Sequence, residues 1–310
     1  MLSRIAESLY WVGRYCERAE DTARLLDVYY HLLLEERGID EVAASRGILE
    51  VMGVDLEQLP DEPDATTVTD LLAWDPSSTG SIASSLRGAW ENARGAREAI
   101  SSEMWETLNS TYRAIAPGSV RASGPAQHRF FAWVRDRAAT LAGLADSTLS
   151  RDDGWHFLAL GRSVERADMT TRLLSAHCGE SLGPSRWTTL LRSCSAYEAY
   201  LRTYHRAVDA SSAVEFLVLD RMFPRSVFHA LSAAETCLVE LDPRASRASN
   251  HGEARRLLGR KCSELAYLRV DDMLADLGRE VESLQSTCAR VHTAVADRYF
   301  PEAYTIEWSV

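Results

Sequence analysis

One stretch of the chain occurs twice, and this repeat constrains the possible folds more than any other feature of the sequence. Residues 13–26 read GRYCERAEDTARLL, and residues 161–174 read GRSVERADMTTRLL. The two copies align without a gap at an offset of 148 residues (161 − 13 = 148). Repeat architectures such as solenoids have periods of roughly 20–50 residues. An offset of nearly half the chain therefore indicates an internal duplication.

Both copies are predicted to form long amphipathic helices. Apolar residues recur at steps of three and four from residue 5 to residue 33, and again from residue 157 to residue 178. Such spacing places the apolar side chains in one stripe along a helix, which is the pattern of a helix packed in a bundle. Asp152 or Asp153 is a suitable N-cap for the second of these helices.

The charges of the repeat allow two interpretations. The motif residues are Glu17, Arg18, Glu165 and Arg166. A wheel projection puts the charges on one flank of the helix, with Arg14, Arg18 and Asp21 pointing furthest from the apolar stripe, and most such charges are solvated. However, the second copy has Met169 where the first has Asp21, so it kept the motif while its surroundings lost polarity. We therefore expect a partly buried network in which Glu17 and Glu165 each contact an arginine.

The rest of the chain is also predicted to be helical. Helical patterns cover approximately residues 3–38, 39–51, 80–115, 128–148, 185–210, 224–241, 252–268 and 271–298, and no run of alternating β-branched residues occurs. Residues 116–127 contain Pro117, Gly118, Gly124 and Pro125 and are the best candidate for a linker. The prediction is an all-α helical bundle built from two fused pseudo-symmetric halves, 1–126 and 127–310, that pack together as one compact unit.

A second, weaker similarity between the halves lies near two predicted helix starts. Asp75 and Ser81 match Asp220 and Ser226 at an offset of 145 residues (220 − 75 = 145). The second of these helix starts, with its free backbone N–H groups and arginines, is suited to a carboxylate or phosphate. The candidate anion-binding residues are Arg221, Arg225 and Ser226, with Arg94 and Arg97 of the long predicted helix completing the site. The alternative is that these arginines only connect helices.

The charge balance excludes several classes of partner. The formal net charge of the chain is −11, so neither a nucleic acid nor an anionic membrane surface is expected as a partner. No apolar run reaches the length of about 18 residues that a membrane span needs, and no targeting segment is expected. The six cysteines lack metal-ligand spacing, which favours reduced thiols in a cytoplasmic protein. A homo-oligomer remains open.

No metal or cofactor is expected. A di-iron bundle needs Glu-x-x-His motifs, whereas the corresponding positions here are Glu17 with Glu20 and Glu165 with Asp168. The acidic residues Glu17, Asp21 and 271–276 superficially resemble the aspartate-rich motifs of magnesium-dependent all-α isoprenoid synthases, and this enzyme class is kept as a distant alternative.

The repeated G-R-x-x-E-R-A pattern resembles the motif that names the bacterial alpha-E family. Further resemblance lies in residues 92–109, in the Phe-Pro-Arg-Ser turn at 223–226 and in the Arg-Tyr-Phe sequence at 298–300. The similarity covers almost the whole chain up to Phe300.

This resemblance implies a cytoplasmic partner of ATP-grasp amide or peptide ligases, specifically of the circularly permuted kind, often alongside transglutaminase-like proteases. It assigns no catalytic residue. The favoured function is an accessory protein that binds the ligase itself or a carboxylate- or phosphate-bearing substrate. The alternative is an enzyme of the same amide-forming pathway that uses the Glu/Arg clusters as acid–base and carboxylate-binding groups.

Overall fold

The computed structural model describes residues 1–35, 38–115, 125–178, 184–243 and 252–301, which are helical and contain no β-strand. The longer helices are α1 (Ser3–Glu35), α2 (Glu41–Val51), α4 (Ile82–Gly95), α5 (Ser102–Ala114), α6 (Pro125–Thr148), α7 (Asp153–Ser175), α8 (Pro184–Ser193), α9 (Tyr197–Tyr204), α11 (Val227–Leu241), α12 (Glu253–Tyr267) and α14 (Leu277–Tyr299). The short ones are α3 (Ala65–Thr69), α10 (Ala210–Val214) and α13 (Val270–Ala275). None of the described helices combines the length and apolar character that a membrane crossing requires.

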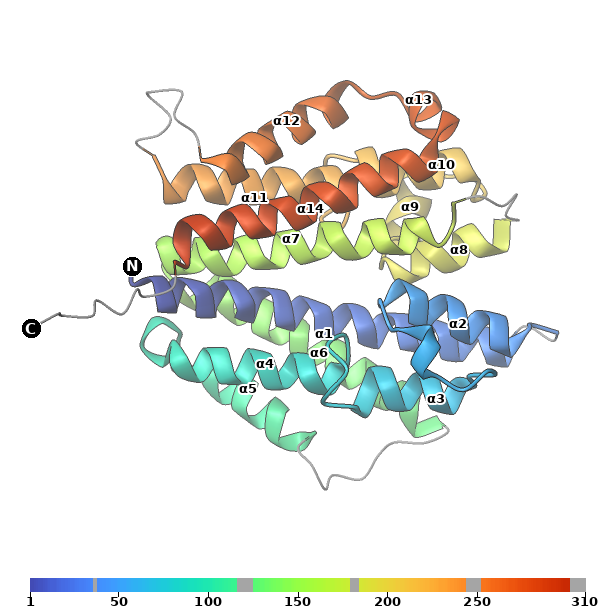
Figure 1. The fold of residues 1–310 in the computed structure, drawn as a ribbon, viewed down its shortest axis with the longest axis horizontal. Helices are drawn as coiled ribbons and strands as arrows, with labels where there is room; N and C mark the ends of the chain where they lie inside the picture. The colour runs from blue at the N-terminus through green and yellow to red at the C-terminus, as the bar shows by residue number, and fades with distance from the viewer. Residues whose placement is uncertain (36–37, 116–124, 179–183, 244–251, 302–310) are drawn as a thin grey trace, which may run out of the picture.

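The two repeat helices, α1 and α7, lie side by side through the middle of the molecule (Figure 1). They run parallel, because Tyr10 of α1 lies against Gly161 of α7 and, further along, Arg18 of α1 bonds to Glu165 of α7. Asp152 caps α7, as the sequence predicts, by accepting hydrogen bonds from two backbone N–H groups of the first turn. The repeated sequences thus form the central helix pair of the fold.

Two glycines of the repeat bring the backbones of α1 and α7 into contact. A Cβ atom added to Gly13 would lie 2.1 Å from the carbonyl oxygen of Leu158, and one added to Gly161 would lie 2.0 Å from the carbonyl oxygen of Tyr10. Tyr10 and Leu158 occupy equivalent positions of the two copies, so the contact is reciprocal. Only glycine, which has no Cβ, allows this approach.

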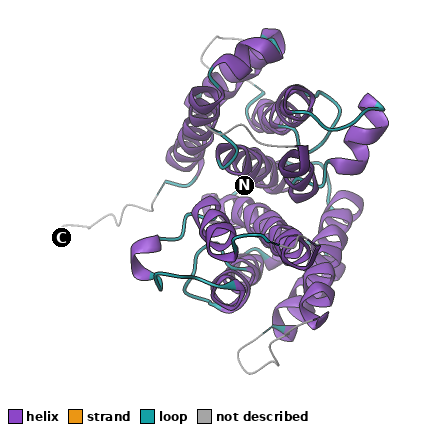
Figure 2. Cartoon of the chain, turned by 90° about the vertical axis from the view of Figure 1, so that its right-hand side faces the viewer, coloured by secondary structure: helices purple, strands orange, loops and turns teal. Residues whose placement is uncertain are grey.

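The other helices surround this pair in matching sets. Helices α4 and α6 pack on α1 and are joined by α5, while α11 and α14 pack on α7 and are joined by α12. In Figure 2 most helices are seen end-on, so their axes are roughly aligned, although the chain runs in either direction along them. The two-fold relation of the complete halves stays a prediction, and these packing sets support it. Since α6 packs on α1 and α5, its packing favours a boundary between α6 and α7 over the predicted one at residue 126.

The segments that lead into α4 and α11 are built from the same elements. Each contains a turn of π-helix, Asp70–Trp74 before α4 and Glu215–Leu219 before α11. Ser81 then caps α4 and Ser226 caps α11, each hydroxyl accepting a backbone N–H three residues later. The weak sequence match at an offset of 145 residues therefore corresponds to equivalent caps.

The single helix predicted for residues 80–115 is wrong. The chain leaves the helix after Gly95 and begins α5 at Ser102, and α5 folds back onto α4. The Ser101 hydroxyl accepts the N–H of Met104 at 3.2 Å and caps the new helix. Residues 92–109, which the prediction put on one helix, are thus divided between two helices.

The close crossing predicts opposite effects for two glycine-to-alanine substitutions. Gly161→Ala should destabilise the protein by about 3 kcal/mol, because the added methyl group meets a backbone carbonyl that cannot rotate away. Gly143→Ala on α6 is the matched control: it is exposed, nothing lies within 4 Å of its Cβ position, and alanine should stabilise this helix by up to about 1 kcal/mol. Denaturant unfolding of both variants measures the difference, and equal stabilities would contradict the backbone contact.

Candidate functional site: an arginine–carboxylate network beside a cavity

Glu165 of the second motif is bound by two arginines from α1. Its carboxylate accepts hydrogen bonds from Arg14 Nε at 2.6 Å and from Arg18 Nε at 2.5 Å, and its side chain is only 2% exposed. Burial would raise the pKa of Glu165, but the two guanidiniums outweigh it and lower the pKa to about 2. Glu165 is therefore ionised and fully engaged within the protein.

Glu17 of the first motif forms the reciprocal bond. Its Oε1 atom accepts from Arg166 Nε at 2.6 Å, just as Glu165 accepts from Arg18. Burial would raise the pKa of Glu17, but Arg225 and Arg166 outweigh this effect and keep the pKa below its ordinary value. The predicted network is thus confirmed: each motif glutamate contacts an arginine of the other copy, and Glu165 is almost inaccessible to solvent.

The two copies differ in one further arginine. Arg225, just before α11, reaches across to α1, where its Nη1 lies 2.5 Å from Asp21 Oδ1 and its Nη2 bonds to Glu20. Its carbonyl oxygen accepts from Thr170 of α7, as that of Gly80 accepts from Thr22 of α1. Glycine at the equivalent position cannot supply a guanidinium.

Asp21 is the least favourably placed acid of the network. Its Oδ2 atom is buried without a hydrogen-bond partner, and the side chain is 4% exposed. Burial raises the pKa of Asp21 well above its usual range, and the nearby charge of Glu17 adds to this effect.

Arg14 and Asp21 are not solvated, although the wheel projection puts them far from the apolar stripe. Both are buried, because α1 is covered by α4 and α6 as well as by α7. One apolar stripe identifies one packed face of a helix, whereas a central helix is enclosed on several sides.

A cavity of about 550 Å³ opens beside the first motif, lined by residues of α1, α6 and α7 and by Arg225. Its charged lining residues are Arg24, Arg135, Arg162, Arg166, Arg225, Glu17, Glu20 and Asp136. Arg162 is the equivalent of Arg14 in the second copy, but its guanidinium lies 3.6 Å from Asp146. The lining itself thus has five arginines and three acids, although every arginine but Arg162 is closely paired with an acid.

The five candidate anion-binding residues do not form one group. Arg225 lines the cavity, whereas the Ser226 hydroxyl caps α11 by accepting the N–H of His229. Arg221 donates to the carbonyl oxygen of Ala266 and lies over Phe228. Arg94 lies over Trp90 and Arg97 over Trp105, so both arginines belong to the α4–α5 hairpin.

Sequence reasoning named Arg166 as a motif residue but did not identify Arg24, Arg135 and Arg162 as site residues beside Arg225. Arg162 could have been found, because it aligns with Arg14 in the repeat. Arg135 lies on α6, outside both copies, and no motif marks it.

The acidic motifs do not assemble as a magnesium site would require. The carboxylates of Glu17, Glu20 and Asp21 offer atoms within 4.8 Å of one another, but the Arg225 guanidinium already contacts all three. Residues 270–275 form α13, which packs on α10 and α14. The two acidic segments therefore lie on different helix pairs.

Comparison with known proteins identifies related sequences but no related structure. The model of the family Alpha-E, described as "a predicted alpha-helical domain with a conserved ER motif", matches residues 1–300. The uncharacterized proteins Mb2597 of Mycobacterium bovis and Rv2567 of Mycobacterium tuberculosis are each 26% identical over 314 residues. The alignment covers 92% of this chain and 35% of each relative, so the chain spans about a third of their length. No solved structure matches.

Removal of the second motif glutamate tests the buried network. Glu165→Ala should lower the free energy of unfolding by about 3 kcal/mol, because it leaves Arg14 buried without its partner. Glu253→Ala is the control, since Glu253 pairs only with exposed arginines and should cost less than about 1 kcal/mol. Denaturant unfolding distinguishes the two, and an unchanged midpoint for Glu165→Ala would show a solvated pair.

The raised pKa of Asp21 predicts that replacing this residue changes how the stability of the protein depends on pH. Because its pKa is raised in the folded state, the native protein holds this proton more tightly than the unfolded chain does, and stability falls as pH rises from about 4 through the folded pKa. The stability of Asp21→Asn relative to the unmodified protein should therefore increase with pH over this window. Asp64→Asn is the control, because hydrogen bonds from Thr67 lower the pKa of Asp64. The stability that Asp64 contributes to the folded protein is therefore lost only below about pH 4. Parallel stability curves for Asp21→Asn and the unmodified protein would contradict the assignment.

Proposed function

This chain belongs to the Alpha-E family, and we propose that it is an accessory protein of an ATP-grasp amide or peptide ligase. In this proposal it binds a carboxylate- or phosphate-bearing substrate in the arginine-lined cavity and presents it to the ligase. The partner is a ligase of the circularly permuted kind, with a transglutaminase-like protease as a further associate in the cytoplasm.

The cavity is the observation on which this proposal rests. A chain with a net charge of −11 repels anions in general, so a local excess of guanidinium groups is the feature that would bind one. Amino acids and peptides carry carboxylates, and their activated forms in ATP-dependent ligation are acyl phosphates. Guanidinium groups bind both through paired, charge-assisted hydrogen bonds.

Different arginines have different roles in this proposal. Arg225 is held by Glu17, Glu20 and Asp21, which fixes the wall of the cavity and leaves little of its charge for a ligand. Arg162 is the better ligand-binding group, because its partner Asp146 lies 3.6 Å away and is half-exposed. The original candidate Arg225 thus becomes a positioning residue, and Arg162 takes its place.

The length of the relatives is compatible with a partner domain. The matched region makes up 35% of each mycobacterial protein, so most of their length lies outside it. A protein that acts together with an enzyme is expected in some cases to be fused to it, and the uncovered part has room for such a domain.

Two arginines that share one acidic partner give a direct test of the cavity. Arg162→Gln should weaken the binding of a glutamate-containing dipeptide or of inorganic pyrophosphate by about tenfold or more, the loss expected for one charged hydrogen bond. Arg151→Gln removes the other guanidinium near Asp146 but leaves the lining unchanged. Isothermal titration calorimetry should show normal binding for this control, and the two probes separate carboxylate from phosphate recognition. Equal affinities for both variants would exclude Arg162 as the binding group.

The partnership needs a separate experiment. We expect affinity capture from the native host to recover an ATP-grasp ligase, and product formation by that ligase to depend on this chain. A ligase that turns over at full rate without the chain would refute the partnership while leaving anion binding intact.

A further inference from the structure

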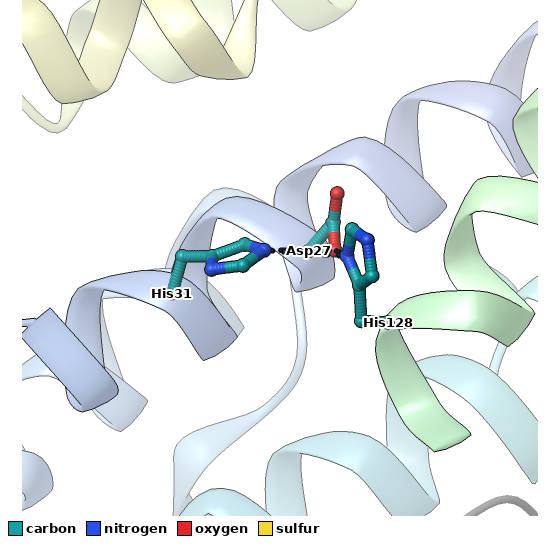
Figure 3. A group of neighbouring side chains, drawn as sticks. All are labelled: Asp27, His31 and His128. Atoms are coloured by element: carbon teal, nitrogen blue, oxygen red, sulfur yellow. Dashed lines mark hydrogen bonds and ion pairs between the residues drawn. The ribbon is translucent and has the colours of Figure 1, made fainter. Parts of the chain in front are cut away.

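Two histidines and an aspartate converge where α1 and α6 meet (Figure 3). Asp27 and His31 are one turn apart on α1, and His128 comes from the start of α6. His128 Nδ1 lies 2.6 Å from Asp27 Oδ1 and 3.2 Å from His31 Nε2, and the latter lies 3.8 Å from Asp27 Oδ1. The three side chains point toward one another (Figure 3).

A single proton on His128 Nδ1 accounts for the closest contact of this group, the 2.6 Å contact with Asp27. A neutral imidazole nitrogen either carries one proton or offers one lone pair. If His128 Nδ1 donates its proton to Asp27, it cannot also accept from His31, whose Nε2 lies 3.2 Å away. Loss of that one proton would leave three atoms that can each offer a lone pair around one point.

We propose that Asp27, His31 and His128 bind a divalent transition-metal ion, with Zn²⁺ as the best match. Two imidazoles and one carboxylate are the donor set of many three-residue zinc sites, in which water completes the coordination. With metal–ligand bonds of about 2.0–2.1 Å, neighbouring ligand atoms of a tetrahedron are about 3.3 Å apart. The three separations, 2.6, 3.2 and 3.8 Å, fall on both sides of that value.

The surroundings allow entry of an ion and orient its ligands. The side chains of His31 and His128 are 42% and 44% exposed, so small rotations can equalise the three distances and solvent can reach the ion. Asp27 is buried, and its other oxygen, Oδ2, forms an ion pair with Arg135 Nη2 at 3.0 Å. An outer partner of this kind holds the orientation of a ligating carboxylate.

The site adjoins the anion-binding cavity through Arg135. This arginine bonds to Asp27 and also lines the cavity, while Arg24, another lining residue, precedes Asp27 by one turn of α1. A bound ion would therefore add positive charge at one side of the cavity. The metal site does not depend on the proposed function, because its test measures metal binding alone.

Titration of the full chain, free of any histidine tag, with Zn²⁺ tests this proposal. The unmodified protein should bind one ion per chain and show a higher melting temperature, since a ligand that binds only the folded state stabilises it. Substitution with Co²⁺ should give the intense visible absorption of a tetrahedral site. His128→Gln and Asp27→Asn should each reduce Zn²⁺ affinity by about tenfold or more, the scale on which even outer-shell changes act.

The control is His205→Asn, at an exposed histidine that follows α9 and is not one of the three proposed ligands. His205 has the left-handed backbone conformation that asparagine tolerates. It should bind Zn²⁺ as the unmodified protein does. Circular dichroism and the metal-free melting curve establish that each variant is folded. The proposal is overturned if the unmodified protein binds no Zn²⁺, or if folded His128→Gln and His205→Asn bind it equally well.

Discussion

The backbone contact between α1 and α7 determines what the rest of the structure can do. Because Gly13 and Gly161 let the helices approach without intervening Cβ atoms, side chains one turn later must pass each other at short range. Glutamate and arginine at these positions extend along the neighbouring helix and bond at its flank. The glycines and the Glu-Arg pairs of the repeat are therefore two parts of one packing arrangement, four residues apart in each copy.

The reciprocal arrangement then diverges at two pairs of positions, Asp21 with Met169 and Gly80 with Arg225. On the α7 side, Glu165 is closed off by Arg14 and Arg18, and the neighbouring position is Met169. On the α1 side, Arg225 takes a place beside Glu17 and requires an acid, Asp21, at the equivalent of that methionine. This arrangement leaves Arg162 to line the cavity instead of repeating the role of Arg14. A duplicated structural contact has in this way become closed on one side and suited to ligand binding on the other.

Sequence reasoning succeeded where two signals reinforced each other. Periodicity and the repeat together predicted helices α1 and α7, their mutual packing and the buried glutamates. It failed where the outcome depends on a neighbour that no pattern identifies. The break between α4 and α5 is marked only by Gly95 and by the cap at Ser101, and the helix formers at residues 96–99 between them hide it in the sequence pattern. Arg135 and His128 belong to α6, whose contact with α1 joins residues about 100 positions apart (128 − 27 = 101), so their roles became apparent only from the fold.

The energetic cost of the network is itself informative about its purpose. Buried ion pairs rarely stabilise a fold more than apolar residues of the same volume would, because each charge loses its hydration. Here the cost includes Asp21, which has an unpartnered oxygen and a raised pKa. The all-apolar solution was accessible, as Met169 in the second copy demonstrates at the equivalent position. An acid retained against that alternative indicates a requirement for the Arg225 guanidinium at this wall of the cavity, and hence for a fixed arrangement of charge there.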